Sequence, residues 1–231
     1  MRFLALSLLL LEIAGCSHEQ PATTNSSTKG TAAGQQVQQA DARDTQLLPN
    51  EIIYLMGGNL TGMTVADLFA DDGYFSFKFV AAGAKVIAVV NDNKQAKAIE
   101  AKKKAMGISD QQLQVRVAPV GDPGIKNGEA DMGFIFHRFV GIADKGGYFT
   151  KMREGLRYPR MLMMLEWKYE NSSDGPPLSE RMTENDIMDF VGTTGYSDVG
   201  AHSAKVPGHV IFMINDYMDV PPADAAPAPG Q

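Results

Sequence analysis

VADLFADDGYF, residues 65–75, is the stretch on which the interpretation of the whole chain depends. An apolar segment ends at Leu68, an acidic loop follows, and Tyr74 opens a segment with apolar residues at helical spacing. In α/β domains a strand, a tight loop and a helix in this order form a corner whose backbone N–H groups can hold an anion or a nucleotide. Such loops use glycine where the backbone must approach the ligand or take a positive φ. This loop contains one glycine, Gly73.

Strands and helices are expected to alternate on both sides of this corner. The run KVIAVV at 85–90 is typical of a strand that is covered on both faces. The expected strands are 64–68, 85–90, 113–117, 130–136 and 161–166, and the expected helices are 51–56, 74–82, 93–106, 147–156 and 184–191. Two further segments, 196–204 and 209–214, should pair as a closing antiparallel hairpin. The alternation predicts an α/β fold whose mostly parallel sheet has helices on both faces.

The loop and its flanks resemble the class I S-adenosylmethionine (SAM)-dependent methyltransferases, whose first motif reads hydrophobic-Asp-x-Gly-x-Gly-x-Gly. GMTVAD at 62–67 and DGYFS at 72–76 are similar to one branch of that family, small bacterial methyltransferase-like proteins. Further matches are DPG at 122–124 and GPP at 175–177, and the resemblance covers nearly all of residues 48–214. It implies a Rossmann-like class I methyltransferase fold, with the hairpin as its C-terminal addition, and SAM as the cofactor.

The resemblance also implies where the cofactor would bind. Asp67 and Gly73 occupy the positions that the family motif requires, whereas Phe69 and Asp71 stand where it has glycines. Phe69 would place a ring where the adenosyl group passes. Asp71 would place a carboxylate near the methionine carboxylate of SAM, and two like charges there repel. After the third strand, Asp122 is the remaining position that the resemblance assigns to the cofactor site.

The second strand also lacks a residue with which the family holds its cofactor. SAM-dependent enzymes have an Asp or Glu at its end to hold the ribose hydroxyls, and the matching residue here is Val90. Valine accepts no hydrogen bond. Asp92 lies two residues on and could replace the acid if the loop bends back. The alternative interpretation of Asp92 is a cap for the helix that begins at Asn93.

Two residues at the ends of later strands are candidates for catalysis. His137 and Glu166 follow the fourth and fifth strands, at the sheet edge where ligands bind in such folds. His137 could be a base or a metal ligand, and the alternative is a surface or hydrogen-bonded structural histidine. Asp92, His137 and Glu166 together have the donor types of a metal site, but no close ligand spacing supports one, so no metal is predicted.

The N-terminus has the features of an export signal. Residues 3–11 are an almost unbroken apolar run, too short to span a bilayer. The run is followed by IAGC at 13–16, which resembles a bacterial lipobox, so residues 1–16 are interpreted as a lipoprotein signal peptide with Cys16 as the lipidated residue. The lipid membrane is thus an expected partner. Ser17 after the cysteine, by resemblance to Gram-negative lipoproteins, favours the outer membrane facing the periplasm.

Composition divides the remaining chain. Residues 17–47 and 220–231 are poor in large apolar side chains and are predicted to be a disordered linker and a disordered Pro/Ala tail, which leaves 48–219 as the methyltransferase-like domain. The net charge is −6 and the basic residues are scattered, so no nucleic-acid surface is indicated. Because Cys16 is the only cysteine, the chain can form no intramolecular disulfide.

These observations leave more than one function open. The first hypothesis is an envelope binding or scaffolding module that has the methyltransferase fold without efficient SAM catalysis, with an envelope protein as a possible partner. SAM is made in the cytoplasm, whereas the chain has an export signal, and this adds to the substitutions at Phe69, Asp71 and Val90. The alternative is an active SAM-dependent methyltransferase with a variant glycine loop. A different ligand in the same crevice is a third hypothesis, with no motif to support it.

Overall fold

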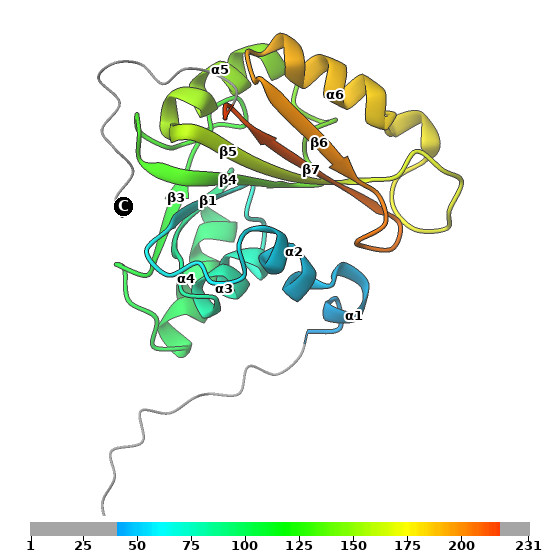
Figure 1. The fold of residues 1–231 in the computed structure, drawn as a ribbon. Coiled ribbons are helices and arrows are strands. Elements are labelled where there is room, and N and C mark those ends of the chain that lie inside the picture. Colours follow the sequence, from blue (N-terminus) through cyan, green and yellow to red (C-terminus); the bar gives the residue numbers. More distant parts are fainter. Residues whose placement is uncertain (1–40, 218–231) are drawn as a thin grey trace, which may run out of the picture. The chain divides into compact units, whose positions relative to one another are not determined.

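Seven strands form one sheet in the order β3-β2-β1-β4-β5-β7-β6 (Figure 1). The computed structural model describes residues 41–217, and the predicted signal peptide, Cys16, most of the linker and the Pro/Ala tail lie outside them. The first five strands are parallel, and β7 is antiparallel to both β5 and β6. The strands are β1 (Thr64–Leu68), β2 (Lys85–Val90), β3 (Leu113–Val117), β4 (Ala130–Phe136), β5 (Leu156–Trp167), β6 (Asp198–His202) and β7 (His209–Asn215). The predicted fold class, with its C-terminal antiparallel hairpin, is confirmed.

Helices cover both faces of this sheet, with α2, α3 and α4 on one side and α5 and α6 on the other (Figure 1). Their bounds are α1 (Asp44–Leu47), α2 (Pro49–Leu55), α3 (Tyr74–Ala81), α4 (Asn93–Ala105), α5 (Lys145–Gly155) and α6 (Glu184–Thr193), with a short 3₁₀ helix η1 (Leu178–Glu180). The Thr183 hydroxyl accepts a hydrogen bond from the Asp186 N–H at 3.1 Å and caps α6.

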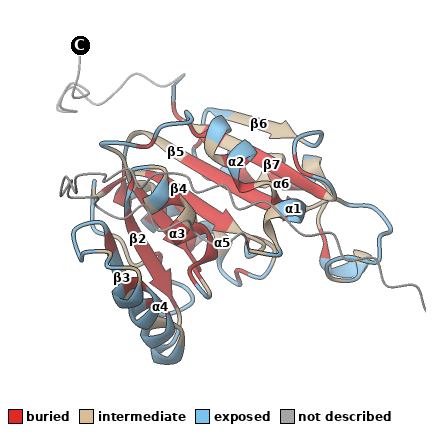
Figure 2. Ribbon diagram, turned by 90° about the horizontal axis from the view of Figure 1, so that it is seen from below, coloured by how far each residue is buried: buried red, intermediate tan, exposed pale blue. Residues whose placement is uncertain are grey.

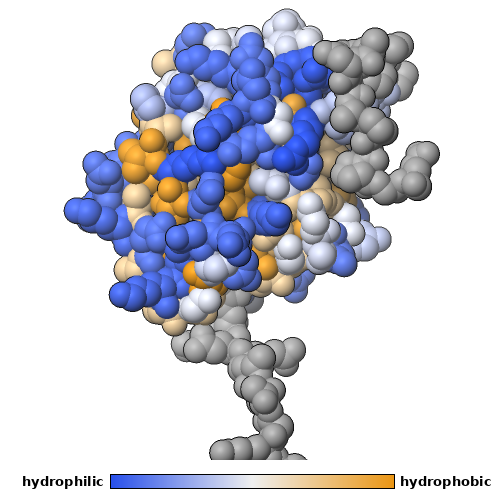
Figure 3. Space-filling view, turned by 90° about the vertical axis from the view of Figure 1, so that its left-hand side faces the viewer, coloured by the Kyte–Doolittle hydropathy of each residue, from blue (hydrophilic) through white to orange (hydrophobic). Residues whose placement is uncertain are grey.

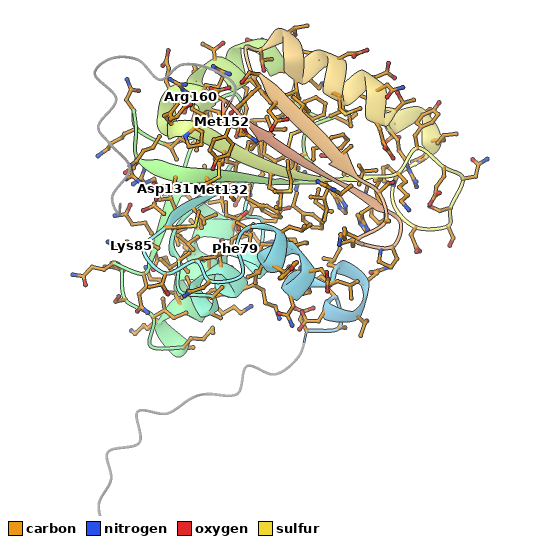
Figure 4. The ribbon with its side chains drawn as sticks, in the orientation of Figure 1. Phe79, Lys85, Asp131, Met132, Met152 and Arg160 are labelled. Atoms are coloured by element: carbon orange, nitrogen blue, oxygen red, sulfur yellow. The ribbon has the colours of Figure 1, made fainter. Side chains whose placement is uncertain are left out.

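Two hydrophobic cores lie on opposite faces of the sheet, because successive side chains of a strand point to opposite sides. In β2, Val86 and Ala88 belong to the core under α2–α4, whereas Ile87 and Val89 belong to the core under α5 and α6. Figure 4 labels Phe79 and Met132 of the core on the α3 side and Met152 of the core on the α5 side. In Figure 2 the central strands are buried while the outer surface of α4 is exposed.

The strand order reverses between β1 and β4. From β1 the chain moves outward through β2 to β3, then returns across the sheet to β4 and continues to β5. At such a switch point the loops after neighbouring strands diverge and leave a crevice outside their carboxyl ends, which is where ligands bind in folds of this kind. The loops after β1 and β4 therefore border the crevice in which a ligand site is expected.

The ordered structure begins earlier than the sequence indicated. The linker was expected to run to residue 47, but α1 already spans Asp44–Leu47. Leu47 is buried, and Asp44 accepts hydrogen bonds from the Tyr74 hydroxyl and the Lys78 ammonium, both at 2.7 Å. A segment with a single large apolar residue can thus fold onto the domain through polar contacts that its own composition does not reveal.

The surface is mainly hydrophilic in the view of Figure 3, with apolar atoms gathered in a smaller area. Exposed large apolar side chains are few within residues 41–217: Tyr54, Val117, Val120, Tyr169 and Tyr217. No helix in the same residues combines the length and the hydropathy needed to cross a bilayer.

Candidate functional site

The loop after β1 has the backbone of a glycine loop although two of its residues are not glycine. Phe69 and Asp71 have φ of 64° and 50°, in the left-handed region that L side chains seldom occupy. Such a residue costs on the order of 1 kcal/mol or more and persists only where its surroundings hold it. Gly73 has a φ of 78°, and a Cβ there would come within 3.0 Å of the Phe77 ring. The backbone at these three positions is therefore the left-handed one that glycine adopts most readily.

Asp67 supports this loop from below. Its carboxylate is buried, and its Oδ2 accepts a hydrogen bond from the Ser76 hydroxyl at 2.5 Å. Burial is the main reason that its pKa is raised to about 7, and the negative charges of Asp71 and Asp72 add to the effect. Asp67 thus ties the end of β1 to the first turn of α3.

Phe69 fills space at the switch point. Its side chain is 6% exposed and stacks on the Tyr148 ring of α5 with 5.4 Å between ring centroids. Two small cavities share Phe69 as a wall, one of about 50 Å³ beside Asp71 and one of about 180 Å³ beside Asn91. Sites for drug-sized ligands and cofactors usually measure roughly 300–1,000 Å³. Phe69 therefore lies in the wall between two cavities, and each of them by itself is smaller than such a site.

Asp71 links three elements across the same crevice. Its Oδ1 accepts hydrogen bonds from Arg138 Nη2 at 2.6 Å, after β4, and from Gln95 Nε2 at 3.2 Å, on α4. All three side chains are wholly or partly accessible to solvent, so the ion pair itself contributes little to stability. Its importance is geometric, because it spans the opening between the loops after β1 and β4.

The start of the described chain lies over the same loop. Arg43 donates to both carboxylate oxygens of Asp72, at 3.2 and 2.8 Å, and its guanidinium lies 4.1 Å from the centre of the Tyr74 ring. Arg43, Asp71 and Asp72 all line the 50 Å³ cavity. Residues 41–48, which we name the N-terminal strap, therefore help to close this compartment from outside.

The residues predicted after β2 and β3 do not line this crevice. Val90 is fully buried in the core under α3 and α4, because the pleat of β2 turns its side chain away. Asp92 accepts hydrogen bonds from the backbone N–H groups of Lys94 and Gln95, which confirms the alternative interpretation as a helix cap. Asp122 accepts from the Gly124 N–H at 2.8 Å within its own turn. The polar residue that follows β2 into the 180 Å³ cavity is Asn91.

The two candidate catalytic residues meet at a third and larger cavity of about 480 Å³. His137 and Gly141 line both this cavity and the 180 Å³ compartment, so the two spaces are neighbours. Glu166 is 4% exposed, and its Oε1 accepts from the Phe139 N–H at 2.8 Å. Burial raises the pKa of Glu166 to about 7. The carboxyl therefore shapes the loop after β4 and also presents a titratable group to the cavity.

His137 has an unusual environment for a structural histidine. Its φ of 52° is left-handed, and its ring stacks on Trp167 at 4.4 Å and on His209 at 4.9 Å between centroids. The Nε2 atoms of both histidines are buried without a hydrogen-bond partner in the described part of the chain. Burial first, and then the neighbouring His209 and cations, lower the pKa of His137 to about 2, so the ring stays uncharged. It is neither the surface histidine nor the hydrogen-bonded one that the alternative interpretation expected.

Arg181 builds the wall opposite these residues, and sequence reasoning did not identify it. The side chain is 7% exposed, and its five N–H donors go to the carbonyl oxygens of Pro176, Lys168, Glu170 and Asp174 and to the Ser172 hydroxyl. The segment between β5 and η1 is thus wrapped around one guanidinium. Within it, Gly175 lies so close to Trp167 that a Cβ would come within 2.5 Å of the indole.

Other residues of the site also went unidentified. Arg138, Tyr148 and Asn91 act through contacts with residues far away in the chain, for which a single sequence holds no signal. Arg138 could have been predicted as a site residue, because it follows His137 directly after the end of a strand. As for a metal, no group of three or more His, Cys, Asp or Glu residues within 41–217 is arranged to hold one.

Comparison with known proteins defines the class of fold. No protein-family model matches the chain, and no curated protein matches its sequence. Solved structures do match it, including a SAM-dependent methyltransferase from Aquifex aeolicus with a TM-score of 0.68 and 17% identity, covering 76% of this chain and 93% of that one. The cyclase SpnF matches with a TM-score of 0.60 and 8% identity, covering 73% and 78%. An S-adenosylmethionine-dependent methyltransferase from Mesorhizobium loti matches with a TM-score of 0.57 and 10% identity, covering 71% and 95%.

The domain thus has the Rossmann-like fold of class I SAM-dependent methyltransferases, as its strand order and hairpin also indicate. At such low identity the likeness establishes the fold alone, and it assigns no activity to this chain.

Proposed function

We propose that this protein is a lipid-anchored envelope protein whose methyltransferase fold serves as a binding or scaffolding module without efficient SAM catalysis. The observation that carries the proposal is Phe69. Its ring is buried against Tyr148 at the switch point and divides the crevice where a nucleotide would lie. The Asp71–Arg138 ion pair supports it because it connects the loops after β1 and β4, and the N-terminal strap supports it because Arg43 lines the smaller cavity. That the cyclase SpnF has a matching fold supports uses of this fold beyond methyl transfer.

Titration of the full chain with SAM and with S-adenosylhomocysteine tests the loss of cofactor binding. We expect no heat of binding in the micromolar range and no shift of the melting temperature at millimolar concentration. A ligand present at about 100 times its Kd stabilises a protein by about 2.7 kcal/mol, so even weak binding would register. Micromolar affinity for either compound would refute the proposal. It would favour the alternative, an active methyltransferase with a variant loop, in which Gly73 keeps the left-handed backbone at the start of α3.

Anchoring is tested by fractionation of cells that express the full chain in a Gram-negative host. We expect the parent in the membrane fraction with the added mass of acyl chains, and Cys16→Ala without that mass and outside the membrane. Ser17→Asp is the matched control, because it leaves the lipidated cysteine in place and should change only the membrane in which the protein resides. Equal fractionation of the parent and Cys16→Ala would contradict the anchor.

A further inference from the structure

The 480 Å³ cavity is large enough for a small organic molecule, and most of its wall is apolar. Its apolar lining consists of Val140, Gly141, Trp167, Pro176, Met182 and Ile187. Four polar side chains complete the wall: His137, Glu166, Glu180 and Arg181. The ligand that fits is therefore decided by what these four residues can donate or accept.

Arg181 has no donor to offer. A guanidinium carries five N–H groups, and all five of Arg181 are already used by oxygen atoms of the segment 168–176. It is the one cation among the described residues that line the cavity. An anionic ligand would thus lose its hydration without gaining a charge-assisted hydrogen bond, which is a costly exchange.

Arg181 also acts against a cationic ligand. It makes no ion pair within residues 41–217, so its positive charge remains in the wall, 5.6 Å from the centre of the Trp167 ring. Glu180 is exposed, where solvent weakens its attraction for a cation. Two polar groups remain for a ligand: the carboxyl of Glu166, which accepts hydrogen bonds when ionised, and the uncharged ring of His137, which has one accepting and one donating nitrogen.

We infer that this cavity binds an uncharged, mainly apolar molecule that donates a hydrogen bond, with an aromatic alcohol as the class that fits best. The apolar walls and the stacked rings of His137 and Trp167 suit a flat body, and the hydroxyl would donate to Glu166 or His137. The inference rests on the proposed function in one respect, since it takes binding, without SAM, as what the site does.

Four naphthalene probes distinguish the chemistry: 2-naphthol, 2-methoxynaphthalene, 2-naphthoate and 2-naphthylmethylammonium. They share one apolar body and differ in whether they donate, only accept, or carry a charge. Titrated into the full chain without SAM, 2-naphthol should bind at least about tenfold more tightly than the other three, because a buried polar site rejects an analogue that leaves its groups unpaired. Equal binding of the methyl ether, or tighter binding of either ion, would overturn the inference.

A pair of variants locates the binding. Met182→Trp places a large ring in the cavity wall and should weaken 2-naphthol binding by at least about tenfold, whereas Asp189→Trp, on the exposed side of α6, should leave it unchanged. The melting temperature of each ligand-free variant shows that it is folded. Equal affinity in both variants would place 2-naphthol elsewhere and overturn the inference.

Repeating the titrations with SAM present tests the ligand class and the proposed loss of SAM binding separately. If the parent protein binds 2-naphthol and SAM independently of each other, the inferred ligand class is supported. The proposed loss of SAM binding is then refuted. Binding of 2-naphthol only in the presence of SAM would overturn the inference, because the cavity would then need the cofactor to form.

Discussion

Replacing Phe69 and Asp71 together by glycine is expected to raise the affinity of this protein for SAM by at least about 100-fold, or about 2.7 kcal/mol. Phe69→Gly removes the ring that separates the 50 and 180 Å³ compartments, and Asp71→Gly removes a carboxylate and its bridge to Arg138. Both positions already have left-handed φ, so glycine fits the existing backbone without rearrangement. Calorimetric titration of the double variant against the parent measures the gain.

A third substitution extends this experiment. The family resemblance places the ribose-binding acid at Val90, but that side chain is buried in the core, where an unpaired carboxylate is costly. Asn91 lines the crevice. We therefore expect Asn91→Asp to add more affinity to the double variant than Val90→Asp does. The opposite order would mean that the end of β2 turns when a nucleotide binds.

Leu48→Gly is the matched control for the double variant. Leu48 also has a left-handed φ, of 43°, but it lines none of the cavities described above and makes none of the contacts by which Arg43 and Asp44 hold the N-terminal strap, so its replacement relieves backbone strain without opening the crevice. Unchanged SAM affinity is expected. If the double variant gains nothing either, then Phe69 and Asp71 do not exclude the cofactor, and the N-terminal strap or Tyr148 becomes the obstacle to remove.

Replacing Asp67 by asparagine is expected to change how stability depends on pH. The folded pKa of Asp67 is raised to about 7 from an ordinary value of 3.8, so between these values the folded state keeps a proton that the unfolded state has lost. The stability of the parent therefore falls as the pH rises through this window, by up to about 4 kcal/mol from this group alone. Asparagine does not titrate and can still accept from Ser76. Asp67→Asn should thus be more stable, relative to the parent, at pH 8 than at pH 4.

Denaturant unfolding at a series of pH values measures this difference. Groups with lowered pKa, such as Glu129 beside Arg116, act in the opposite direction but are common to both chains and cancel. Glu166→Gln should show an effect of the same sign, because burial raises the pKa of Glu166 from 4.5 to about 7. A stability difference between Asp67→Asn and the parent that stays constant from pH 4 to pH 8 would disprove the assigned shift.

Much of the fold follows from local patterns in the sequence. The bounds of β1, β2, β3 and β4 agree with the predicted strands, of which β2 and β4 are largely apolar runs and β3 alternates apolar and polar residues. β5 begins at Leu156, before the expected 161, since its first residues pair with β4 across a register irregularity that apolar periodicity cannot indicate. Local signals thus locate the central elements and are weakest where pairing extends past the apolar run.

The candidate site depends on information that one sequence does not contain. Asp71 and Arg138 are 67 residues apart, and nothing in either segment indicates that they form a pair. Val90 and Asn91 differ by one position, which in a strand decides between the core and the crevice. The motif therefore located the strand–loop–helix corner, whereas the side chains that meet across it depend on tertiary contacts.

The left-handed backbone at Phe69 and Asp71 has a consequence for how the protein could change over generations. Since the main chain already has the conformation that glycine adopts, an open crevice and a closed one can be built on the same scaffold. A few codon changes would separate the two, and none of them would require the sheet or its helices to move. Under the proposed function, a lineage with this loop would pass between a nucleotide-free and a nucleotide-binding form through substitutions at these two positions.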